Sequence, residues 1–118
     1  MEDHSGPAEN DWIPVLAADA LLEGKPARGT VGGEDIFVYR VGDHIVALGN
    51  RCTHQGGPLH RGRVTSYGDI SAVTCPIHGS VFRLDDGSVL RGPATSPQPV
   101  YETRLNDGMI ELRPRRGR

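Results

Sequence analysis

The chain has 118 residues, with 13 basic and 15 acidic side chains and a formal net charge of −2. This length fits one domain with a modest hydrophobic core. The charge gives no reason to expect a nucleic-acid partner, and no run approaches the roughly 20 apolar residues that a membrane-spanning helix needs. Sixteen glycines, nine prolines and few aromatic side chains favour an all-β chain with many turns.

The amino-terminal part predicts little regular structure. Residues 1–11 are polar and acidic, and we expect them to be a disordered tail. Residues 12–16 predict an edge strand, because Pro14 has no N–H to donate to a neighbouring strand. Residues 19–22 predict one helical turn that ends at Gly24.

The rest of the chain predicts strands separated by glycine-containing turns. Residues 35–41 and 44–48 flank Gly42-Asp43 and predict a β-hairpin. This order predicts an antiparallel meander, and the fold class is therefore an antiparallel β-sandwich or barrel. A basic tail follows at residues 114–118, which we expect to be frayed. Further strands are expected at residues 70–74, 80–84, 89–90, 100–105 and 109–112.

The only two cysteines each have a histidine nearby. Cys52-Thr53-His54 and Cys75-Pro76-Ile77-His78 together provide two sulfur and two nitrogen ligands. Such ligands suit a tetrahedral zinc ion or an iron–sulfur centre better than calcium or magnesium. Zinc fingers usually group two cysteines and two histidines separately, whereas here each segment holds one of each, which fits a two-iron cluster better.

At these residues the chain resembles the small soluble Rieske [2Fe-2S] ferredoxins. The resemblance extends to Gly57-Pro58-Leu59, to Gly79-Ser80, and to Gly92-Pro93-Ala94, which is similar to the proline loop that covers the cluster in that family. It implies a Rieske domain over residues 12–113 with a cluster-binding subdomain at about residues 50–93 inserted in the β base. It also implies one [2Fe-2S] cluster, with one iron held by the buried Cys52 and Cys75 and the other by the surface residues His54 and His78.

The ligand set predicts an easily reduced centre. Two thiolates leave an oxidised two-iron, two-sulfide cluster neutral, whereas four would give it a charge of −2. Histidine-ligated clusters accordingly have potentials of roughly −150 to +300 mV, against about −400 mV for plant-type clusters. In high-potential Rieske proteins a serine and a tyrosine donate hydrogen bonds to the cluster and a disulfide joins the ligand loops. Here Ser80 is present, Phe82 stands in place of the tyrosine, and there is no spare cysteine, which predicts a potential in the lower part of this range.

The remaining charged and titratable residues permit more than one interpretation. Five arginines lie close in sequence to the ligands, either as ordinary solvated side chains or as a basic docking face. We expect His60 to have a surface role rather than to bind metal, and His4 and His44 to be exposed. Two unrelated alternatives remain for the four predicted ligands, namely buried cysteines with unconnected histidines, and a zinc site. The five arginines are Arg51, Arg61, Arg63, Arg83 and Arg91.

The family resemblance implies a one-electron carrier rather than an enzyme. Its partners would be a flavin-containing reductase and an oxygenase, for example a ring-hydroxylating dioxygenase. Alternatives are a Rieske small subunit or module of a larger oxidoreductase, such as a nitrite-reductase-type complex or a membrane-anchored fusion, and a zinc-binding structural module. The first residues lack the basic start and apolar run of a signal peptide, so we expect a cytoplasmic location without a membrane span.

Overall fold

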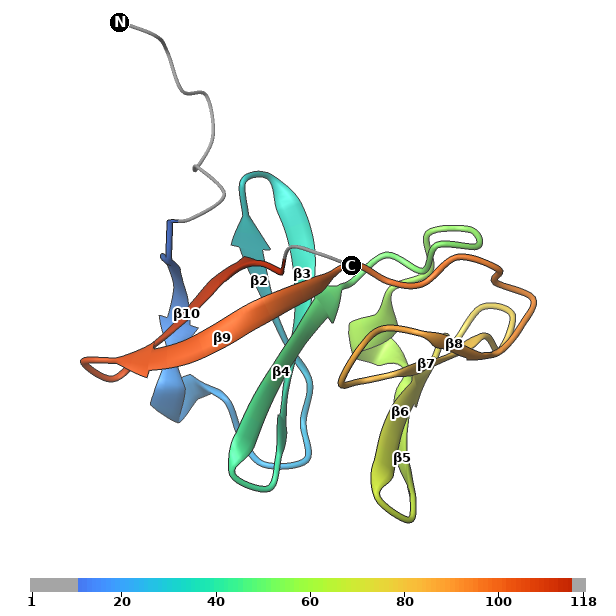
Figure 1. Ribbon diagram of the computed structural model, residues 1–118, viewed down its shortest axis with the longest axis horizontal. Helices are drawn as coiled ribbons and strands as arrows, with labels where there is room; N and C mark the ends of the chain where they lie inside the picture. Colours follow the sequence, from blue (N-terminus) through green and yellow to red (C-terminus); the bar gives the residue numbers. More distant parts are fainter. Residues whose placement is uncertain (1–10, 116–118) are drawn as a thin grey trace, which may run out of the picture.

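The computed structural model describes residues 11–115 and confirms an all-β chain built from two antiparallel sheets. Figure 1 shows the two sheets at opposite ends of the longest axis. The predicted disorder of residues 1–10 and the predicted exposure of His4 lie outside the described residues. The strands are β1 (Ile13–Ala17), β2 (Ala27–Val31), β3 (Glu34–Val41), β4 (His44–Gly49), β5 (Arg63–Tyr67), β6 (Ile70–Thr74), β7 (Val81–Arg83), β8 (Val89–Arg91), β9 (Val100–Asn106) and β10 (Met109–Pro114).

Six strands form the base sheet, in the order β1-β10-β9-β4-β3-β2. Its two end strands approach each other, since Gly29 of β2 lies directly against the side chain of Val15 in β1. The sheet therefore curls toward a barrel. Its apolar core consists of Leu21, Val31, Ile36, Val38, Ala47, Ile110 and Leu112, all nearly inaccessible to solvent.

The second sheet has four short strands in the order β5-β6-β7-β8 and lies between β4 and β9 in the chain. It falls within the residues expected to form an inserted subdomain. A second apolar core joins it to the base and includes Phe37 and Leu48 from the base, Phe82 from β7, and both cysteines. The thiols are therefore part of a hydrophobic core.

The structure adjusts several predicted elements. The predicted helical turn at 19–22 is a 3-10 turn, η1 (Ala18–Ala20), and a second turn, η2 (Leu59–Arg61), was not predicted. Strands β2 and β5 were also missed, and β10 runs through Pro114 into the predicted tail. Within residues 11–115, no helix is long and apolar enough to cross a membrane.

Candidate metal centre

The first cysteine opens a tight loop after β4. The N–H of Cys52 donates to the carbonyl of Gly57 at 2.8 Å, and the N–H of Gly56 donates to the carbonyl of Cys52 at 2.7 Å. Gly56 has φ +76°, a conformation that glycine adopts without steric cost. We call residues 52–57 loop 1.

The second cysteine opens a loop with the same backbone hydrogen bonds. The N–H of Cys75 donates to the carbonyl of Ser80 at 2.7 Å, and the N–H of Gly79 donates to the carbonyl of Cys75 at 3.1 Å. Gly79 has φ +83° and occupies the place that Gly56 has in loop 1. We call residues 75–80 loop 2; the two loops therefore present their cysteines in the same way.

The structure brings the four predicted ligands together as two pairs. Cys52 and Cys75 are only 4% and 3% exposed, and both are free thiols. The rings of His54 and His78 are exposed, with centroids 5.3 Å apart and planes at 83° to each other. Sulfur is thus paired with sulfur inside the molecule and nitrogen with nitrogen at its surface.

The sulfur environment fits a bound thiolate. Burial raises the pKa of the Cys75 thiol and the neighbouring Cys52 thiol raises it further, while N–H groups of Ile77 and His78 lower it. Two adjacent buried thiolates therefore need a cation to compensate their charge. The backbone N–H groups are placed to donate to the sulfur, as in iron–sulfur sites.

The pairing also bears on the kind of metal group that fits. Within residues 11–115, no three His, Cys, Asp or Glu side chains gather as they would around one metal ion. Two irons with two protein ligands each match two separate pairs. The loops are close-packed at the sulfur side, since a Cβ added at Gly57 would lie 2.7 Å from the Cys75 Sγ and 2.6 Å from the Ile77 Cγ1.

The two residues expected to influence the potential are the last residue of loop 2, Ser80, and Phe82 just after the loop. Ser80 is fully buried, and its Oγ accepts the N–H of Ala94 at 2.9 Å. Among the described residues nothing accepts the Ser80 hydroxyl proton, so this group can donate to a sulfur of a bound cluster. Phe82 is also fully buried and offers no hydroxyl.

Asn50, at the entrance to loop 1, is a fully buried polar residue that the sequence analysis missed. Its Oδ1 accepts the N–H of His60 at 2.7 Å, and its Nδ2 donates to Asp35 at 3.0 Å and lies 2.9 Å from the Nδ1 of His60. Because the Asn50 amide nitrogen is a donor, the His60 Nδ1 is the acceptor and the ring is neutral. His60 is only partly buried, and its bonds to Asn50 add a structural role to the surface position that was expected.

Electrostatics agrees with this network. Burial lowers the pKa of His60 below its ordinary value, and the positive charges of Arg28 and Arg61 lower it further, against the opposing charge of Asp35. Burial acts to raise the pKa of Asp35, but hydrogen bonds from Arg28 and Asn50 outweigh it and keep that pKa low. The network joins β2 and β3 of the base to both ends of loop 1.

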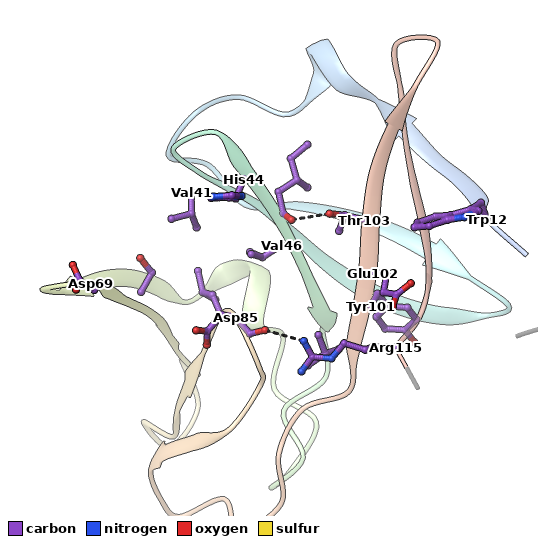
Figure 2. A pocket seen from close by; sticks show the side chains of 14 residues that line it. Trp12, Val41, His44, Val46, Asp69, Asp85, Tyr101, Glu102, Thr103 and Arg115 are labelled. Atoms are coloured by element: carbon purple, nitrogen blue, oxygen red, sulfur yellow. Dashed lines mark hydrogen bonds between the residues drawn. The ribbon is translucent and has the colours of Figure 1, made fainter. Parts of the chain in front are cut away.

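A cavity of about 600 Å³ lies between β4, β9 and the second sheet, away from both loops. Figure 2 shows Thr103 bonded to the carbonyl of Ile45 and Arg115 to the carbonyl of Asp85 in its lining. Two of its carboxylates already face arginines, Asp85 with Arg83 and Glu102 with Arg113. None of the four predicted ligands lines this cavity.

Comparison with known proteins then decides the family. Residues 11–102 match the family model of the Rieske [2Fe-2S] domain. The chain belongs to this family. The Rieske domain carries a [2Fe-2S] cluster, which is therefore the cofactor of this chain, and its fold and paired donors fit that group.

Individual relatives of this Rieske protein agree. It is 32% identical, over 86% of its length and 91% of the relative's, to the anthranilate 1,2-dioxygenase ferredoxin subunit of Burkholderia cepacia. A chain in the complex of reduced oxygenase and oxidized ferredoxin of carbazole 1,9a-dioxygenase is 34% identical, with a TM-score of 0.72 over 86% of this chain and 92% of that one. A Mycobacterium tuberculosis protein described as an NADH-dependent nitrite reductase small subunit is 31% identical, with a TM-score of 0.76 over 86% and 93%.

Proposed function

We propose that this Rieske protein is a ferredoxin that carries single electrons from a flavin-containing reductase to a terminal oxygenase, such as a ring-hydroxylating dioxygenase. The observation that carries the proposal is the pairing of two buried cysteines with two exposed histidines whose rings lie 5.3 Å apart. The relative named as a dioxygenase ferredoxin subunit, which this chain matches over nearly its whole length, supports it.

We assign Cys52 and Cys75 as ligands of the inner iron and His54 and His78 as ligands of the outer iron. When bound, the cluster supplies reversible one-electron transfer. The protein holds the sulfur ligands within an apolar core and away from water. The exposed imidazoles provide the shortest path from the site to a docked partner.

We further propose that residues 12–113 form one Rieske domain, in which residues 50–93 are the cluster-binding subdomain; the basic residues 114–118 follow, with Pro114 still part of β10. The four-stranded sheet β5-β6-β7-β8 lies wholly within residues 50–93, which supports this division. We place the carrier in the cytoplasm, where reductase and oxygenase systems find NADH.

We expect a midpoint potential in the lower part of the Rieske range. Phe82 lies fully buried beside loop 2 and cannot donate a hydrogen bond, so Ser80 is the hydroxyl donor left at this loop. A redox titration should give a value below about +200 mV, and a value above that would contradict this explanation.

The function is tested by reconstitution with a flavin reductase and an aromatic-ring oxygenase of the same organism. NADH-dependent product formation should require this protein, and the Cys75→Ser variant should not replace it. Electron delivery by the reductase alone at the full rate would contradict the proposal. The similarity to a nitrite reductase small subunit makes that complex the second candidate, which copurification with a nitrite-reducing flavoprotein would favour.

A further inference from the structure

The segment between β8 and β9 runs beside both ligand loops. We call residues 94–98 of this segment the strap. In Figure 1 it is drawn in orange at the end of the molecule that carries the loops. Its hydrogen bonds to residues outside the segment span separations of 11 to 49 residues. It is therefore a tertiary connection and not a local turn.

Gln98 bonds the strap to loop 1 and to the residues just before it. Its side chain is buried, with the residue only 2% exposed, and uses both ends of its amide. The Oε1 accepts the N–H of Thr53 at 2.8 Å, and the Nε2 donates to the carbonyls of Gly49 at 2.8 Å and Arg51 at 2.9 Å. One side chain thus bonds to three backbone groups around Cys52.

Thr53 lies between the two ligands of loop 1 and is held by the strap twice. Besides its N–H bond to Gln98, its Oγ1 donates to the carbonyl of Ser96 at 2.6 Å. The peptide group that Gln98 holds joins Cys52 to Thr53, and His54 is the next residue. The orientation of this peptide group therefore affects how the Cys52 sulfur and the His54 nitrogen are presented together.

The other end of the strap bonds to loop 2. The N–H of Ala94 donates to the Oγ of Ser80 at 2.9 Å, and the backbone carbonyl of Ser80 closes loop 2 by accepting the N–H of Cys75. Both groups are buried, where a hydrogen bond is costly to leave unmade. The strap therefore connects the two loops without a covalent bond.

We infer that Gln98 is a positioning residue that holds loop 1 in register with loop 2, and so sets the geometry of the cluster ligands. Both cysteines are assigned to iron, so no thiol is left for a disulfide between the loops. The hydrogen bonds of the strap supply that connection instead. This inference rests on the ligand assignment proposed above.

The test replaces Gln98 in the full-length, cluster-loaded protein. Gln98→Met keeps the side-chain length but makes none of the three bonds. Gln98→Glu keeps an acceptor for Thr53 but loses both donors and places a carboxylate against two carbonyls. Thr103→Val is the matched control, because it removes a partly buried bond to the Ile45 carbonyl in the base.

Two measurements report on loop 1 directly. Amide hydrogen exchange of residues 49–54 should become at least about tenfold faster in Gln98→Met, since the loss of even one of the three buried hydrogen bonds has about that effect, and should stay unchanged in Thr103→Val. In pulsed electron paramagnetic resonance, one of the two histidine nitrogen couplings should shift and the other should not. Exchange and couplings equal to those of Thr103→Val would overturn the inference.

A second variant keeps the test decisive if Gln98→Met does not fold. Thr53→Val removes only the bond to the Ser96 carbonyl and should speed exchange of residues 49–54 about threefold to tenfold. No change in this variant would equally count against the strap. Iron and sulfide are assayed first: wild-type protein without a cluster refutes the proposed function, whereas a loaded protein that tolerates both substitutions refutes only this inference.

Discussion

The base sheet and the ligand-bearing region are built in different ways. The base has strands of up to eight residues and a core made only of apolar side chains. In the other region β7 and β8 have three residues each, and its core includes both cysteines. Of the four buried polar residues within residues 11–115, three also lie at the ligand loops, namely Asn50, Ser80 and Gln98.

This difference indicates where each region obtains its stability. Burial of apolar area is sufficient for a long, regular sheet. The ligand-bearing region also has an apolar core, but that core includes two thiols and is surrounded by buried polar side chains. It therefore depends in addition on satisfied hydrogen bonds and on the metal group that its thiols bind. The region that carries the electron is therefore the one that should respond first to loss of a ligand.

The largest effect is expected from Cys75→Ser. This variant should lose the cluster, and residues 50–93 should lose most of their protection from hydrogen exchange while the base strands keep theirs. Iron analysis and exchange mapping measure both outcomes. Leu112→Ala is the converse control, because it should cost about 2–5 kcal/mol in the base core and leave the ligand set intact. Equal loss of protection in both regions of Cys75→Ser would contradict the comparison.

Two glycines allow the same steric change to be made in each region. Ala at Gly57 would place a methyl group 2.7 Å from the Cys75 Sγ, so Gly57→Ala should lower cluster content severalfold. Ala at Gly29 would meet the Val15 side chain, so Gly29→Ala should lower thermal stability by about 1–3 kcal/mol without loss of iron.

Second substitutions sharpen this test of the two glycines. Val15→Ala should restore the stability of Gly29→Ala. Ile77→Ala should restore the cluster content of Gly57→Ala only in part, because the Cys75 sulfur still blocks the added methyl group. If Ile77→Ala restored the cluster content of Gly57→Ala completely, the close contact between Gly57 and the Cys75 sulfur would not be what limits cluster binding.

The two regions also differ in charge. Residues 50–93 contain five arginines, three aspartates and no glutamate or lysine, whereas the rest of residues 11–115 has nine acidic and six basic side chains. If the arginines form a docking face, oxidation of the reduced protein by ferricyanide should slow as salt is added. The net charge of −2 alone predicts the opposite.

One charge variant in each region decides whether the arginines or the net charge set the rate of oxidation by ferricyanide. Arg61→Gln should slow the reaction about twofold to threefold at low salt, whereas Leu105→Glu, with the same change in net charge at the far end of β9, should have little effect. A rate that rises with salt in the wild type would mean that the arginines are only solvated side chains.

The sequence indicated the candidate ligands but not the residues that hold their loops. Cysteine and histidine have few roles at such spacing, so their pattern alone pointed to a metal site. Gln98 could not be found in this way, because its partner Thr53 is 45 residues away and no sequence motif marks a glutamine whose side chain bonds to a distant backbone. Strand β2 was missed because Gly29 suggests a turn, while the structure needs glycine there to admit Val15.

The smallest effect is expected at His60, which the hydrogen bonds of Asn50 connect to Asp35 in the base sheet. Its pKa is below 6.5 in the folded protein, so folding disfavours protonation, and the stability contributed by the neutral ring is lost as the pH falls below 6.5. His60→Gln should reduce the drop in melting temperature between pH 7 and pH 5 by no more than about 4 °C. An unchanged drop would show that protonation of His60 does not contribute to the loss of stability at low pH.

The most direct test of the account is electron paramagnetic resonance of the anaerobically purified protein, with iron and acid-labile sulfide assayed on the same sample. We predict two irons and two sulfides per chain, a silent oxidised state, and on reduction a rhombic signal with two coupled histidine nitrogens. Zinc without sulfide, or a reduced cluster with no histidine coupling, would contradict the assignment of Cys52, His54, Cys75 and His78.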